Sequence, residues 1–151
     1  MMLLKKYGPA AVEDNRHHKV TKALEDVTFI NIAVTGVIAN ITKSFSQSAL
    51  GHMMYDGVRT FFTQEAKDAL HGEIVAVALF TQLYYNKLSE QKEQLKEFMR
   101  GMDMPLTLEE LGVPCTEKNL KTLEDYLIDS PYVDPSPESL ALLHEAMKQM
   151  Q

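Results

Sequence analysis

The chain has one cysteine, no tryptophan, and no run of apolar residues long enough to cross a membrane. Cys115 has no partner for an internal disulfide or a cysteine metal cluster, so we expect a reducing, cytoplasmic setting. The most apolar stretch, residues 27–41, contains threonine and asparagine and is shorter than the roughly 20 residues of a membrane span. At the start of the chain the apolar residues precede the lysines, the reverse of a signal peptide. We expect a soluble protein without membrane contact.

Positive charge is also scarce. The sequence has 15 Lys and Arg against 21 Asp and Glu, a formal net charge of −6. Such a balance gives no electrostatic attraction to phosphate backbones, so nucleic acid is excluded as a partner. The hydrophobic fraction of 45% and charged fraction of 24% are typical of a folded globular protein. At this length we expect one domain spanning residues 1–151.

The sequence has no convincing alternation of strands with helices and no glycine-rich phosphate loop after a strand. Apolar residues instead recur at three- and four-residue steps, which is typical of helices. This spacing covers residues 22–41, 49–62, 73–85, 89–102, 117–128 and 136–150. The sequence therefore predicts an all-α, helical bundle-like domain.

Residues 22–41 and residues 107–110 carry additional signals. Residues 22–41 are rich in β-branched side chains, which also favour strands, but the segment is longer than a usual strand, so we favour a helix. Its most apolar part, residues 27–41, fits a buried core helix. Residues 107–110 have a capping-box pattern, in which Thr107 and Glu110 satisfy free amide hydrogens at a helix start. Gly112 and Pro114 follow and predict the end of a short helix.

The histidines are the side chains in this sequence best suited to bind a metal or transfer a proton. His17 and His18 are adjacent in a polar run, and His144 lies in the last helix, so we interpret all three as surface residues. His52 and His71 lie among small and apolar neighbours, but they are too far apart in sequence for one helix face. Spacing alone favours two separate core histidines, and a shared metal remains the alternative.

The motifs around these histidines resemble a known family. Residues 52–57 read HMMYDG, residues 70–73 read LHGE, and residues 104–112 and the loop at 135–137 also take part. Together they are similar to the second half of glycerol dehydrogenases, in the iron-containing alcohol dehydrogenase superfamily, whose fold includes dehydroquinate synthase. The likeness runs from about Leu24 to the last helix, and the first eight residues resemble the middle of a family helix. It implies a fold like the helical C-terminal domain of that family.

The resemblance implies a metal site. His52 and His71 match two histidines that bind one divalent metal, Zn(II) or Fe(II). In the family the metal stabilises the alkoxide of a small polyol or alcohol while hydride passes to NAD(P). Glu73 then either supports a ligand from behind or serves as a carboxylate at a helix N-terminus, the more common role.

Several features depart from the family pattern. The third ligand, an aspartate, has no counterpart, because Asp14 and Asp26 lie in different surroundings. Tyr55 stands where the family has a second motif histidine, which weakens a proton-shuttle role for that position, and Asp56 stands where it has asparagine. Phe45 is a candidate to line a pocket, or to staple the start of a helix.

The sequence also contains no recognisable Rossmann-like cofactor domain. We therefore expect the metal-binding helical domain of an NAD(P)-dependent dehydrogenase, inactive by itself and binding NAD(P) only with the missing domain. It would work as a homo-oligomer or with a separate Rossmann-domain partner. The alternative is a non-catalytic helical interaction module.

Overall fold

The computed structural model describes residues 2–37 and 49–151, and in these ranges the chain forms helices and no strand. The all-α prediction is therefore confirmed. The chain divides into two compact units, Met1–Gln47 and Ser48–Gln151. Whether it works as one domain over residues 1–151 stays a prediction. Of the helices in the described ranges, none is long and apolar enough to cross a membrane.

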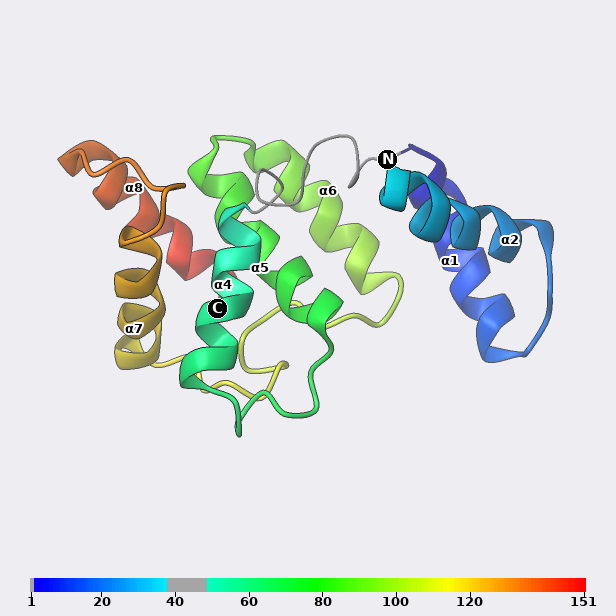
Figure 1. The fold of residues 1–151 in the computed structure, drawn as a ribbon, viewed down its shortest axis with the longest axis horizontal. Coiled ribbons are helices and arrows are strands. Elements are labelled where there is room, and N and C mark those ends of the chain that lie inside the picture. Colours follow the sequence, from blue (N-terminus) through cyan, green and yellow to red (C-terminus); the bar gives the residue numbers. More distant parts are fainter. Residues whose placement is uncertain (1, 38–48) are drawn as a thin grey trace. The chain divides into compact units, whose positions relative to one another are not determined.

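The first unit is a helical hairpin (Figure 1). Helix α1 (Met2–Arg16) packs against α2 (Lys22–Phe29), which continues through a π-helical turn, η1 (Ile30–Val34). Thr21 begins α2, because its hydroxyl oxygen accepts a hydrogen bond from the amide of Leu24 at 3.3 Å. The same hydroxyl donates to Asp14 of α1 at 2.5 Å, which ties the connection to the first helix.

The helix expected over residues 22–41 is present in the described part of that segment, but the expectation that residues 27–41 form a buried core helix is wrong there. The residues are helical through Val37, but α2 and η1 have no buried side chain. Phe29 is 64% exposed and Ile32 72% exposed. The physical reason is that two helices cover only one face of each other, and the described part of this unit, residues 2–37, has no further layer. Residues 38–41 lie outside the described residues.

The second unit contains the main hydrophobic core. Its helices are α4 (Leu50–Phe61), α5 (His71–Tyr85), α6 (Ser89–Arg100), α7 (Glu117–Ile128), α8 (Pro137–Met147) and the 3₁₀ turn η3 (Lys148–Met150). Helix α5 packs against α4, α6, α8 and η3, so it is central to the unit (Figure 1). This position explains why its sequence is apolar nearly all round, with Val77 and Phe80 fully buried.

Helices α4 and α5 run antiparallel. The amide of Gly51, near the start of α4, donates to the side-chain oxygen of Gln82, near the end of α5, at 2.9 Å. At the other end Arg59 donates to the carbonyl of Ala69, just before α5 begins. A Cβ at Gly51 would lie 3.3 Å from the Gln82 oxygen, so glycine permits this close approach.

The predicted short helix at residues 107–111 is wrong, because the segment forms consecutive turns. The capping bonds themselves are present: the Thr107 hydroxyl accepts from the Glu110 amide at 3.2 Å, and the Glu110 carboxylate accepts from the Leu106 amide at 2.5 Å. Gly112 then adopts φ 91°, and the Val113 amide donates back to the carbonyl of Leu108. The chain thus closes after one turn, before a helix can propagate.

Candidate functional site

The structure brings His52 and His71 together from two helices. His52 lies in the first turn of α4, and His71 is the first residue of α5. Their ring centroids are 5.9 Å apart, with a 52° angle between the ring planes, and both residues are exposed. Two imidazoles on one tetrahedral zinc have centroids roughly 5 Å apart. The pair is thus close to the separation that a shared metal requires, and its role as a ligand pair stays a prediction.

The two histidines belong to a row of four side chains, which we call the aromatic row: Arg59, Tyr55, His71 and His52. Tyr55 lies one turn after His52 in α4, and its ring centroid is 4.2 Å from that of His71. Arg59 lies one turn further, with its guanidinium carbon 5.5 Å from the Tyr55 centroid. Tyr55 therefore lies between a cation and an imidazole, in contact with the candidate ligand His71.

Arg59 also joins α4 to the loop at residues 62–70. Its guanidinium donates to the carbonyl of Ala66 at 2.8 Å and to that of Ala69 at 2.6 Å. The loop leads directly into His71. At the same end of α5, the Glu73 carboxylate accepts from the Leu70 amide at 2.8 Å, so Glu73 acts as a helix cap, the more common of the two roles expected for it.

The donor set fits part of a metal site. Imidazole nitrogen suits both Zn(II) and Fe(II). In the part of the chain that the structure describes, no group of three or more His, Cys, Asp or Glu is placed to hold a metal ion. Asp14 and Asp26 lie in the first unit, where Asp14 accepts from Thr21 and Asp26 pairs with Lys22. The residues therefore fit two ligands of such a site, and further ligands have to come from elsewhere.

The other three histidines lie on the surface, as expected. His17 is hydrogen bonded to Glu13 at 2.8 Å, and His18 follows the end of α1. His144 in α8 bonds through Nδ1 to Glu124 of α7 at 3.0 Å, which links these helices. Sequence reasoning missed the Glu124 partner, because the contact depends on how α7 packs on α8.

The other residues singled out by the sequence are Phe45, Tyr55 and Cys115. Phe45 lies outside the described residues. Tyr55 is half-buried in the aromatic row. Burial, together with the nearby Glu109 charge, raises the pKa of the Cys115 thiol, so its reactive thiolate is scarce at neutral pH.

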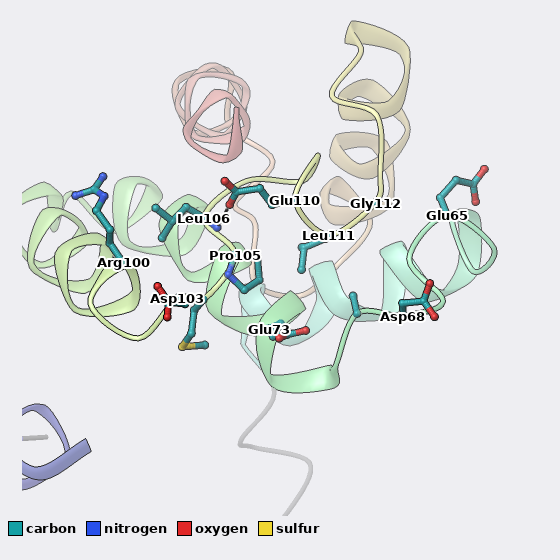
Figure 2. Close-up of a pocket in the computed structure, with 12 residues that line it drawn as sticks. Glu65, Asp68, Glu73, Arg100, Asp103, Pro105, Leu106, Glu110, Leu111 and Gly112 are labelled. Atoms are coloured by element: carbon teal, nitrogen blue, oxygen red, sulfur yellow. Dashed lines mark hydrogen bonds between the residues drawn. The ribbon is translucent and has the colours of Figure 1, made fainter. Parts of the chain in front are cut away.

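A separate acidic cleft of about 730 Å³ lies in the second unit (Figure 2). Glu73 reaches it from α5, whereas Asp103 and Glu110 come from the turns after α6. Glu65 and Asp68 of the loop at 62–70 and one cation, Arg100, complete its charged lining. Neither His52 nor His71 lines this cleft, and its lining has no histidine, cysteine or hydroxyl side chain. It is therefore a different feature from the histidine pair.

The sequence comparison found a relative, and it links the chain to glycerol dehydrogenases. The chain is 30% identical over 114 residues to Glycerol dehydrogenase 1 of Schizosaccharomyces pombe. The match covers 74% of this chain and 24% of that protein, so the chain spans about a quarter of the length of its relative. No family model matches the chain.

Proposed function

We propose that this chain is the metal-binding helical part of an NAD(P)-dependent polyol or alcohol dehydrogenase, in which His52 and His71 bind one Zn(II) or Fe(II). The observation that carries the proposal is the 5.9 Å separation of two imidazoles that begin different helices. The similarity to a glycerol dehydrogenase supports the class of reaction. In this proposal the helical fold is that of the C-terminal domain of dehydroquinate synthase-like proteins.

The chemical roles follow from the residues. A bound divalent metal acts as a Lewis acid, which stabilises the alkoxide of a small polyol or alcohol as hydride leaves its carbon. His52 and His71 hold the metal, and Tyr55 packs against His71 and limits the rotation of its ring. The nicotinamide site and a third ligand come from a partner polypeptide. The chain then works as a homo-oligomer or with a Rossmann-domain partner, in the cytoplasm.

The test of the metal site is a titration of the full chain with Zn(II) by isothermal calorimetry. We expect binding of modest affinity, because only two of three protein ligands are at hand, and loss of binding in His52→Ala and in His71→Ala. His144→Ala is the matched control, since this histidine is engaged with Glu124 on other helices, and it should bind like the parent chain. No heat above background at high micromolar zinc, or an unchanged titration in His71→Ala, would disprove the assignment.

One observation favours a second candidate function, a helical interaction module. In the first unit Phe29, Ile32 and Val37 are each more than half exposed, and exposed apolar surface of this kind drives association. Light scattering of the full chain at rising concentration tests this candidate. We expect association that the double substitution Phe29→Ser with Ile32→Ser removes, whereas the serine pair Phe61→Ser with Leu70→Ser in the second unit leaves it unchanged. A parent chain that stays monomeric at high concentration argues against the module.

A further inference from the structure

Arg59 occupies a position that the metal-site proposal leaves without a role. Its guanidinium makes two hydrogen bonds to loop carbonyls and also lies against the ring of Tyr55. A guanidinium fork is planar and holds its partners in one geometry, which a lysine ammonium does not do. One side chain of α4 thus contacts both the loop that precedes His71 and the ring that packs on His71.

We propose that Arg59 is the positioning residue that holds the candidate ligand His71 in place beside His52 before any metal arrives. This inference rests on the proposed function. The two carbonyl bonds fix where the loop delivers the first residue of α5, and the cation above Tyr55 holds the phenol ring on the His71 imidazole. Both contacts restrict His71, whose ring is otherwise exposed at a helix start.

The physical consequence is preorganisation. An exposed histidine at the first position of a helix samples several side-chain rotamers, and binding a metal would cost the entropy of selecting one of them. Packing against Tyr55 removes part of that freedom in advance. Residues that orient a metal ligand in this way change metal affinity by about 10- to 100-fold when they are removed.

The experiment compares the full chain with Arg59→Gln, Arg59→Lys and the matched control Lys67→Gln. Lys67 lies exposed in the same loop, so its substitution removes one positive charge from that loop without removing the fork. We expect zinc affinity to fall about 10-fold or more in Arg59→Gln. Arg59→Lys should fall between, because it keeps the charge and loses the paired donors, and Lys67→Gln should bind like the parent chain.

A second readout needs no metal. The Tyr55 ring should shift the NMR signals of the His71 ring protons, because the two ring centroids are only 4.2 Å apart. In Arg59→Gln these signals should move toward the positions of a free histidine, while Tyr55→Phe keeps the ring and should leave them in place. As a control, circular dichroism of each variant tests whether the helices remain folded. Should Arg59→Gln fail to fold, Arg59→Lys provides both readouts.

The two readouts separate the two proposals. If the parent chain binds zinc and Arg59→Gln binds it equally well, the positioning role is wrong and the metal site stands. If the parent chain does not bind zinc, the metal site fails, and unmoved His71 signals in Arg59→Gln would then overturn the positioning role on its own evidence. Adding Arg59→Gln to Tyr55→Leu should cost less affinity than Arg59→Gln costs alone, and fully additive losses would exclude the route through Tyr55.

Discussion

Gly112 is a residue at which the second unit tolerates little change. Its backbone adopts φ 91°, a left-handed conformation that L side chains rarely occupy. A Cβ added there would overlap the carbonyl oxygen of Glu65, so the turn at 107–112 and the loop at 62–70 approach each other only over glycine. Any other residue here would therefore have both a strained backbone and a steric clash. The clash is with a backbone atom, which cannot move away as a flexible side chain could.

We therefore predict that Gly112→Ala lowers the free energy of unfolding by about 2 kcal/mol or more, from strain and displacement of the loop. Urea denaturation followed by circular dichroism measures the change. The matched control is Gly72→Ala in the first turn of α5, where a Cβ meets nothing within 4 Å. That substitution should leave stability unchanged or raise it by about 0.5 kcal/mol. Equal midpoints for Gly112→Ala and the parent chain would refute the prediction.

At the scale of elements, the entry to α8 depends on a carboxylate. The Asp134 side chain accepts a hydrogen bond from the Ser136 amide at 2.8 Å, and Ser136 in turn caps α8 by accepting from Ser139. Hydrogen bonding from Ser136 holds the pKa of the Asp134 carboxyl below its usual value. The charged form is thus favoured in the folded state, and the interaction helps to position the start of the helix.

Acid therefore weakens this interaction. Because the folded pKa is depressed, the stabilisation is complete above the unfolded pKa of about 4 and is lost as pH falls through the folded value. We predict that Asp134→Ala lowers the melting temperature slightly at pH 7 and that this gap closes in stronger acid. Asp134→Asn keeps a hydrogen-bond acceptor but cannot titrate. The difference in melting temperature between Asp134→Asn and Asp134→Ala should therefore not change with pH. A gap that persists unchanged below pH 3 contradicts the assignment.

Elements are also where sequence reasoning had most success. The helices of the second unit follow from apolar spacing, because each buries one stripe, or in α5 the whole surface, in a common core. The failure at residues 107–111 has a local cause: the capping residues are present, but Gly112 ends the turn before a helix forms. A pattern of caps predicts where a helix begins and says little about whether enough residues follow.

The candidate site was less accessible to sequence reasoning. The spacing of His52 and His71 did not predict their contact, which depends on how the start of α4 packs across α5. Only the resemblance of their motifs to a family singled them out. Arg59 escaped altogether, since its partners are backbone carbonyls, and any residue type offers those. Roles that side chains play toward the backbone leave no composition signal in the sequence.

At the scale of the whole molecule, the two units differ in how their apolar residues are used. Among the residues that the structure describes, the second unit contains nearly all of the buried hydrophobic ones, with Ala11 as the exception in the first unit. Apolar spacing alone gave both the same interpretation, a helix buried on its apolar side. The spacing fixes which face of a helix is apolar, whereas the number of neighbouring layers decides whether that face is covered. In the first unit, α2 and η1 therefore have the apolar spacing of a core helix, but no side chain in them is buried.

The Arg59 fork has one more consequence, for the choice of ion. The carbonyl oxygens of Ala66 and Ala69 already accept from the guanidinium, so the loop beside His71 does not offer them to a cation. Hard ions such as Ca²⁺ and Mg²⁺ seek several oxygen ligands, whereas borderline ions accept imidazole nitrogen. Together with the two imidazole ligands, one arginine would therefore disfavour Ca²⁺ and Mg²⁺ at the proposed site.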